Sequence, residues 1–169
     1  MQLVKLDPSF YPANTHLVQV MDKTGTIWDP TKIRGYGIVV IAINELTFGI
    51  PLRSHINHQA AYFTVRNPGY VKGKTPYGKG LDFSKALLIS QPHYLSSQVF
   101  KIDAVEHKKL VSKQYYIEQL FNDYVEKYVA AQKKSDHNIL NSMEYRHTTL
   151  QNYHPELGIL PKVTVVKVV

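Results

Sequence analysis

The feature that most constrains the fold is a pair of apolar runs separated by a two-residue turn. Residues 36–43 (YGIVVIAI) are rich in β-branched side chains, and a second run, 46–52 (LTFGIPL), follows Asn44 and Glu45. Runs of this composition, bounded by turn residues, predict the two strands of a β-hairpin. Further strands are expected at residues 3–6, 62–65, 85–90 and 98–104, with a closing strand at 163–169 (VTVVKVV).

The hydrophobic period changes in residues 106–134. Apolar side chains recur there at steps of three and four, interrupted only by Lys113, at Leu110, Ile117, Leu120, Phe121, Tyr124 and Tyr128. This pattern predicts an amphipathic helix, and a second helix is expected over residues 139–153. Short strands before and after helices indicate an α+β domain, and we expect a compact, highly curved antiparallel β-barrel with added helices. The length of 169 residues predicts a single domain, 1–169.

The composition excludes several classes of protein. The chain contains no cysteine, which excludes a disulfide framework, a cysteine-based zinc site and thiol catalysis. No apolar run approaches the roughly 20 residues of a membrane span, and the first residues lack a signal-peptide pattern. We therefore expect a cytoplasmic protein that does not contact a membrane.

Most of the net charge of +7 comes from one segment of the chain. Residues 53–90 carry six basic side chains against one acidic side chain, Asp82, and so contribute +5 of the total. A concentration of positive charge indicates an anionic partner such as nucleic acid. A basic surface that only keeps the protein soluble is the alternative.

Within this segment, residues 67–80 combine turn residues with aromatic and basic side chains. Four glycines and two prolines predict a loop. Tyr70 and Tyr77 alternate with Lys72, Lys74 and Lys79, a combination suited to single-stranded RNA because bases stack on rings while ammonium groups meet phosphates. The glycines match neither a P-loop nor a dinucleotide fingerprint, so no nucleotide cofactor is expected.

The most suggestive cluster for chemistry directly follows the second hairpin strand: Arg53, Ser54, His55 and His58. These residue types can bind phosphate and transfer protons near neutral pH; two surface histidines at a hairpin end are the alternative. Two histidines three residues apart, without a third ligand, are a poor zinc signal. A two-metal nuclease needs several carboxylates, and Asp82 is the only carboxylate in residues 53–90. We therefore expect no metal.

Metal-independent RNA cleavage uses the ribose 2′-hydroxyl as the nucleophile. The protein must remove one proton, deliver another and stabilise the negative charge that develops on the phosphorus oxygens. His55 and His58 could transfer the protons, Arg53 and Lys85 could stabilise the charge, and Ser54 could donate a hydrogen bond to a phosphate oxygen.

Three stretches together resemble toxins of type III toxin–antitoxin systems, most closely the TenpN-like branch: 33–58 (IRGYGIVVIAINELTFGIPLRSHINH), 79–90 (KGLDFSKALLIS) and 146–159 (RHTTLQNYHPELGI). The resemblance implies a Kid/MazF-like barrel. It also implies a sequence-selective endoribonuclease that cuts without metal and leaves a 2′,3′-cyclic phosphate. Its substrates would be cellular or phage RNA, consistent with a role in phage defence. Its inhibitor would be a small repetitive RNA antitoxin that the toxin processes and holds in a closed assembly.

The resemblance carries over to particular positions. Pro51-Leu52-Arg53-Ser54 matches the family's Pro-Leu-x-Ser stretch, whereas Ile56 stands where some relatives have a lysine. Gly80, Leu81 and Lys85 match a Gly-Leu-x-x-x-Lys stretch, which implies that Lys85 faces the same pocket. Arg146, His147, Tyr153 and His154 fall in the third stretch, where helix packing and capping are an equal alternative to a catalytic role.

The remaining candidate RNA-binding residues lie before and beside the hairpin. The full set is Lys32, Arg34, Tyr36, Arg66, Tyr70, Lys72, Lys74, Tyr77 and Lys79. Tyr36 and Trp28 are candidates for either the core or base stacking. A non-enzymatic RNA-binding module explains the charge and the tyrosines equally well.

Overall fold

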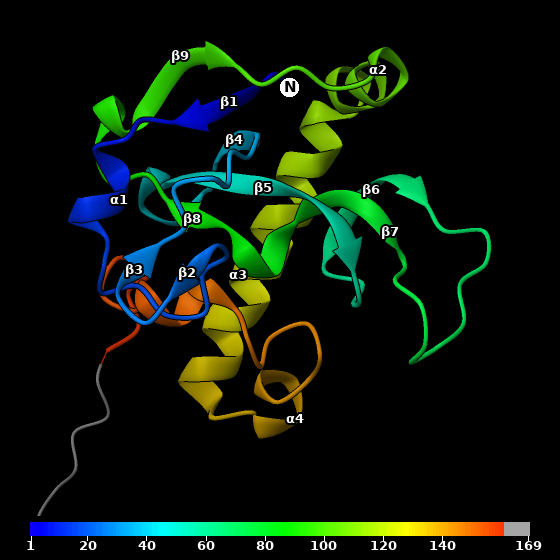
Figure 1. Cartoon of the computed structure of the whole chain (residues 1–169). Helices are drawn as coiled ribbons and strands as arrows, with labels where there is room; N and C mark the ends of the chain where they lie inside the picture. Colours follow the sequence, from blue (N-terminus) through cyan, green and yellow to red (C-terminus); the bar gives the residue numbers. More distant parts are fainter. Residues whose placement is uncertain (161–169) are drawn as a thin grey trace, which may run out of the picture.

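Seven strands form one sheet, and every pairing in it is antiparallel. The structure is a computed structural model that describes residues 1–160. The strand order is β6-β7-β5-β4-β1-β9, with β8 also paired to β5 (Figure 1). The strands are β1 (Leu3–Leu6), β4 (Tyr36–Val40), β5 (Thr47–Ile56), β6 (Ala61–Arg66), β7 (Gly78–Asp82), β8 (Leu87–Leu88) and β9 (Leu95–Val99); β2 (Lys23–Thr24) and β3 (Ile27–Trp28) form a separate two-stranded sheet.

The long strand β5 organises the sheet. On one side it pairs with β4 along residues 47–51. On the other side it pairs first with β8, through Phe48, and then with β7, through Leu52 and Arg53. Between β7 and β8 the chain leaves this edge in a single 3₁₀ turn, η2 (Phe83–Lys85). The side chains of η2 therefore lie beside the second half of β5.

Two consecutive helices cover one face of the sheet (Figure 1). Helix α2 (Ala104–Ser112) is capped by the Asp103 carboxylate, and α3 (Gln114–Lys134) begins after Lys113. The apolar stripe of α3 is buried in the core, where the rings of Phe48 and Phe121 meet edge to face at 5.4 Å. The short elements are α1 (Phe10–Ala13), α4 (His137–Leu140), η1 (Ile43–Glu45), η3 (Pro92–Tyr94) and η4 (Thr149–Asn152).

The structure confirms the hairpin and the strands expected at 3–6 and 62–65. The strand expected at 85–90 is reduced to Leu87–Leu88, because Lys85 belongs to η2. The strand expected at 98–104 lies instead at Leu95–Val99, because Asp103 already caps a helix. The expected loop 67–80 ends earlier, at β7.

The helical expectations were right in part. The helix predicted over 106–134 is divided at Lys113, whose φ of −116° and ψ of 13° lie outside the helical region. The helix expected over 139–153 is wrong, because α4 ends at Leu140 and turns lead from there to η4. The closing strand expected at 163–169 lies outside the described residues.

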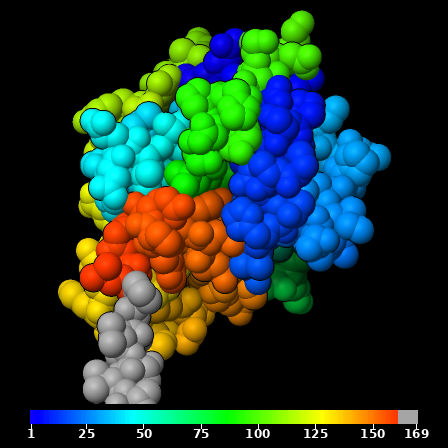
Figure 2. Space-filling model, turned by 90° about the vertical axis from the view of Figure 1, so that its left-hand side faces the viewer, coloured from blue at the N-terminus to red at the C-terminus, as the bar shows by residue number. Residues whose placement is uncertain are grey.

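The segment after α4 packs against the start of the chain (Figure 2). The Asn152 side chain accepts a hydrogen bond from the Val18 N–H and donates one to the Val18 carbonyl, both at 2.8 Å. The described part of the chain is thus an α+β fold with an antiparallel sheet, whose end strands β6 and β9 do not pair with each other. None of the helices found between residues 1 and 160 has the length and apolar character needed to cross a membrane.

Candidate functional site

A polar pocket of about 360 Å³ opens where β5 ends beside η2. Four segments form its wall: the turn before β2, the end of β5 with the turn after it, η2, and the turns that follow α4. We call it the basic pocket and define it by its lining residues, which are Gln19, Arg53, Asn57, His58, Ser84, Lys85, Met143, Arg146 and His147.

The floor of the basic pocket is built around one fully buried carboxylate, Asp82. Its Oδ2 accepts a hydrogen bond from Arg53 Nη1 at 2.8 Å. Its Oδ1 accepts bonds from the backbone N–H of Ser84 at 3.0 Å and from the Ser84 hydroxyl at 2.8 Å. Asp82 therefore orients one cation of the pocket wall and also caps the η2 turn.

His58 is the second partner of Asp82. Its Nε2 lies 3.3 Å from Asp82 Oδ1 and 3.1 Å from the Ser84 hydroxyl oxygen. Because that hydroxyl donates its proton to Asp82, its hydrogen bond with His58 requires a proton on Nε2. In the neutral ring Nδ1 is then unprotonated, and this buried atom has no hydrogen-bond partner among the described residues.

Opposing effects act on the Asp82 carboxyl. Burial raises the pKa of Asp82, but the hydrogen bond and positive charge of His58 lower it, as do the hydrogen bonds from Arg53 and Ser84. The net pKa lies below the ordinary value of 3.8, so the carboxylate is ionised at neutral pH.

Lys85 connects two distant segments across the rim of the pocket. Its Nζ donates hydrogen bonds to the carbonyl of Gln19 at 2.8 Å and to the carbonyl of His147 at 2.7 Å. Burial lowers the pKa of Lys85, with the Asp82 charge raising it and the Arg53 charge lowering it further. The ammonium group thus holds the wall together and adds positive charge to it.

All the charged side chains that line the basic pocket are basic. Three cationic side chains (Arg53, Lys85 and Arg146) and two imidazoles (His58 and His147) line it, and no carboxylate does. Asp82 lies behind this surface with no solvent exposure. Such an arrangement favours an anion with several acceptor oxygens, such as a phosphate diester.

Only three of the five predicted catalytic residues line the basic pocket. Arg53, His58 and Lys85 come together in the basic pocket, but Ser54 and His55 are exposed outside its lining. Those two contact each other, with Ser54 Oγ 2.9 Å from His55 Nδ1. The physical reason is a register shift in the pairing of β5 with β7 between Arg53 and Ile56, which interrupts the regular alternation of side chains.

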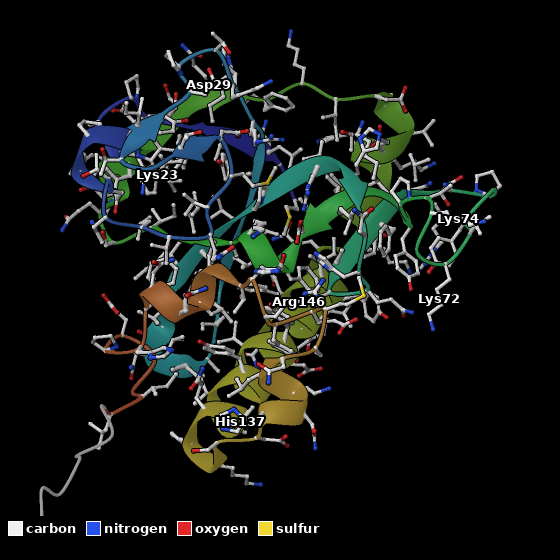
Figure 3. All side chains as sticks on the ribbon, turned by 60° about the horizontal axis from the view of Figure 1, so that its bottom comes forward. Lys23, Asp29, Lys72, Lys74, His137 and Arg146 are labelled. Atoms are coloured by element: carbon white, nitrogen blue, oxygen red, sulfur yellow. The ribbon has the colours of Figure 1, made fainter. Side chains whose placement is uncertain are left out.

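The structure adds two residues to the candidate site, Arg146, which is labelled in Figure 3, and His147. Both are exposed and come from the turns after α4. The sequence signal for them was their place in the third stretch that resembles the toxins. Their contribution to a pocket was not predictable, because a regular helix had been expected at those positions.

The loop of residues 67–77 extends away from the sheet between β6 and β7 (Figure 1). The rings of Tyr70 and Tyr77 stack on each other with centroids 4.1 Å apart. Lys72 and Lys74 lie between the two tyrosines on the same loop and are exposed (Figure 3). The loop therefore places a half-buried aromatic pair beside two exposed ammonium groups.

Three other predicted RNA-binding residues are engaged within the protein. Lys79 forms an ion pair with Glu106 at 2.6 Å, and the Arg66 guanidinium lies over the Phe63 ring at 4.8 Å. Tyr36 is buried in the core, where burial raises its pKa, so its ring is not accessible for base stacking. Lys32 and Arg34 line a different cavity.

Within residues 1–160, no group of three or more histidine, aspartate or glutamate side chains is placed to hold a metal ion. Comparison with known proteins gives no relative from which a function could be transferred. No protein-family model, no curated protein and no solved structure matches the chain.

Proposed function

We propose that this protein is a sequence-selective endoribonuclease that cleaves RNA without a metal ion, and that it acts as the toxin of a type III toxin–antitoxin system. The observation that carries the proposal is the basic pocket, which gathers three cations and two imidazoles without a lining carboxylate. The loop 67–77, with its stacked tyrosines and exposed lysines, supports RNA as the polymer.

In this proposal the pocket binds the scissile phosphate through Arg53, Lys85 and Arg146. The ribose 2′-oxygen forms a bond to phosphorus, and the bond from phosphorus to the 5′-oxygen breaks, which leaves a 2′,3′-cyclic phosphate. His147, the exposed imidazole of the pocket, takes the proton of the 2′-hydroxyl and, once protonated, delivers a proton to the leaving 5′-oxygen; His58, whose Nδ1 is buried, helps to position Asp82. The cations stabilise the negative charge that develops between these events.

Ser54 and His55 have a secondary part in the proposal. Both are exposed next to the pocket at the end of β5. In the proposal they contact the nucleotide beyond the scissile phosphate rather than the reacting atoms. The proposed partner is a small repetitive RNA antitoxin that the toxin processes and holds in a closed assembly. Short tandem repeats ending in a terminator just upstream of the reading frame would support that partner.

The antiparallel sheet is compatible with a specific barrel type. The described strands form an antiparallel sheet with β6 and β9 at its ends. We propose that the sheet belongs to the Kid/MazF-like barrel type with added helices. An experimental structure that includes residues 161–169 tests this by showing whether the sheet closes.

The function is tested with purified protein, labelled RNA and variants of the pocket. Arg146→Ala and His147→Gln remove exposed groups, so both variants should fold normally, and each should reduce the cleavage rate at least tenfold. Lys108→Gln, at an exposed position on α2, is the matched control and should leave the rate unchanged. If both pocket variants cleave like the wild type, the pocket is not the active site.

A non-enzymatic RNA-binding module is the second candidate. The observation that favours it is that two cations of the pocket are already engaged within the protein. Lys85 donates to two backbone carbonyls and Arg53 donates to Asp82, so both have a structural role that does not require catalysis. A binding module would retard RNA on a gel and never shorten it.

A further inference from the structure

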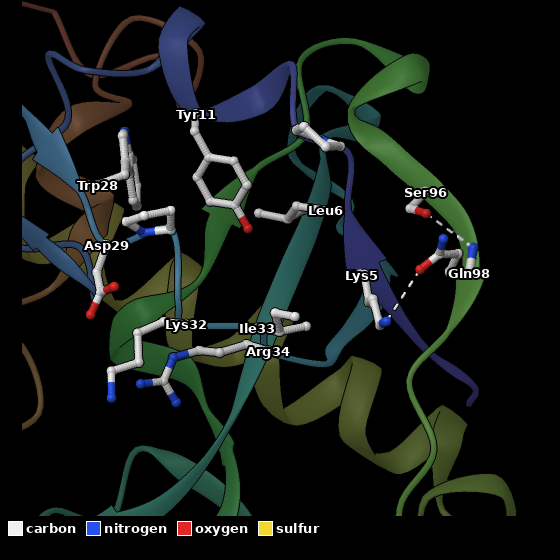
Figure 4. Close-up of a pocket in the computed structure, with 12 residues that line it drawn as sticks. Lys5, Leu6, Tyr11, Trp28, Asp29, Lys32, Ile33, Arg34, Ser96 and Gln98 are labelled. Atoms are coloured by element: carbon white, nitrogen blue, oxygen red, sulfur yellow. Dashed lines mark hydrogen bonds between the residues drawn. The ribbon is translucent and has the colours of Figure 1, made fainter.

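A second cavity, of about 520 Å³, lies on another part of the surface. It is bounded by β1, α1, the segment after β3 and β9 (Figure 4). We call it the aromatic pocket; its lining residues are Lys5, Leu6, Pro8, Tyr11, Trp28, Asp29, Pro30, Lys32, Ile33, Arg34, Ser96 and Gln98. It shares no lining residue with the basic pocket.

Two aromatic rings form one wall of the aromatic pocket. Tyr11 and Trp28 meet edge to face with ring centroids 5.3 Å apart, and Tyr11 points its hydroxyl into the space between Leu6 and the segment that carries Ile33 (Figure 4). Pairing of β2 with β3 places Lys23 opposite Trp28, with its ammonium 5.9 Å from the centroid of the indole. These contacts hold the wall in place.

Basic side chains surround this aromatic wall. Among residues 1–160, the Lys5 ammonium has a single hydrogen-bond partner, the neutral Gln98 amide oxygen at 3.2 Å, and Lys32 is exposed. The Arg34 guanidinium is paired with the Asp22 carboxylate. Asp29 is the only carboxylate in the lining, and its oxygen accepts two bonds from Thr31. Lys5 and Lys32 thus remain available for a negatively charged group.

From this combination we infer that the aromatic pocket binds one nucleotide, with the base against Tyr11 and Trp28 and the phosphate near Lys5 or Lys32. The volume lies within the range of small-molecule sites, which are mostly apolar with a few placed polar groups. An aromatic wall suits a base because each base presents a π-face for stacking. The assignment rests on the proposed function only in taking RNA as the source of the nucleotide. In that case an unpaired base of the strand would bind in the aromatic pocket while another part of the same strand enters the basic pocket.

Trp28 is the only tryptophan in the chain, so its fluorescence reports on the aromatic pocket alone. The wild-type protein is titrated with the 5′-monophosphates of adenosine, guanosine, cytidine and uridine, none of which contains a bond that a ribonuclease cuts. We expect saturable quenching by at least one of them. Ribose 5-phosphate should have no effect, because it carries the phosphate without a base.

Variants identify the site. Tyr11→Leu removes a stacking partner and should weaken binding about tenfold, the equivalent of 1.4 kcal/mol. Lys32→Gln should weaken it severalfold, and Lys108→Gln and the basic-pocket variant Arg146→Ala should not change it. A tetranucleotide that binds more tightly than the monophosphate indicates RNA as the source, and equal affinity indicates a free nucleotide.

The inference is overturned if no nucleotide quenches Trp28, if ribose 5-phosphate quenches equally, or if Tyr11→Leu and Lys32→Gln bind like the wild type. These results do not depend on cleavage. Quenching without any RNA cleavage would remove the proposed function and leave the nucleotide site. RNA cleavage without quenching of Trp28 would remove the nucleotide site and leave the proposed function.

Discussion

Arg53 on β5 and Asp82 at the end of β7 form an ion pair of 2.8 Å across two neighbouring strands, with the Asp82 side chain fully buried and the Arg53 side chain 30% exposed. The pair connects the interior of the sheet to the wall of the basic pocket. Since Asp82 also contacts His58, one buried carboxylate fixes both a cation and a buried imidazole of the pocket wall.

Removal of the arginine should therefore cost stability. Arg53→Ala leaves the Asp82 charge buried without its cation, and we expect the free energy of unfolding to fall by about 2 kcal/mol, the range for hydrogen bonds to charged groups. Urea denaturation measures the change. Lys108→Ala, at an exposed position, should stay within about 0.5 kcal/mol of the wild type, and an equally small effect of Arg53→Ala would contradict the role given to the pair.

The same carboxylate predicts a dependence of stability on pH. The pKa of Asp82 is lower in the folded protein than its ordinary value of 3.8. Its contribution is therefore fully present above that value and is lost as the pH falls through the folded-state pKa. Asp82→Asn should flatten the acid side of a plot of unfolding free energy against pH.

Asp29→Asn is the matched control for this titration. Hydrogen bonds from Thr31 lower the pKa of Asp29 too, but that carboxylate is exposed. We expect the control to change the acid limb much less than Asp82→Asn. Identical pH profiles of the Asp82 variant and the wild type would show that the buried carboxylate is not coupled to folding.

The contacts of Lys85 predict a local rather than a global effect. Lys85→Met removes the two hydrogen bonds that join the carbonyls of Gln19 and His147. Amide hydrogen exchange should become faster in residues 17–20 and 146–149, while β4 and β5 keep their protection. Unchanged exchange in both segments would mean that Lys85 does not hold the rim of the basic pocket.

Gly80, near the base of the exposed loop, has no room for a larger side chain. A Cβ atom at Gly80 would overlap with the carbonyl oxygen of Tyr62 on β6. Gly80→Ala should therefore destabilise the protein by about 2 kcal/mol or more, as overpacking does. Gly69→Ala is the control, because its nearest neighbour is Asn67 Oδ1 at 3.5 Å. Equal melting temperatures of the two variants would contradict this account.

The local parts of the fold were predictable from sequence because they depend on short-range patterns. The β-branched runs around Asn44 specified the hairpin, and the apolar steps from Leu110 to Tyr128 specified the helical region. Lys113, the one break in that stripe, is the residue at which the helix divides. Residues 141–153 misled the prediction, because apolar spacing there serves packing of turns against the core rather than a helix.

The candidate site was predictable only in part because it is formed by tertiary structure. Arg53 and Lys85 were selected from composition and resemblance, and both line the basic pocket. The register shift that turns Ser54 and His55 away from it depends on how β7 pairs with β5. The approach of Arg146 and His147 depends on turns some 90 residues further along the chain, which no local pattern near Arg53 encodes.

The most direct test of the central claim is the fate of RNA incubated with the purified protein in excess chelator. We predict shorter fragments that end in a 2′,3′-cyclic phosphate, and no cut where a 2′-deoxynucleotide replaces the ribonucleotide on the 5′ side of the cleaved bond. RNA that stays intact, cleavage that needs an added divalent ion, or equal cleavage of the deoxy-substituted strand would contradict the account.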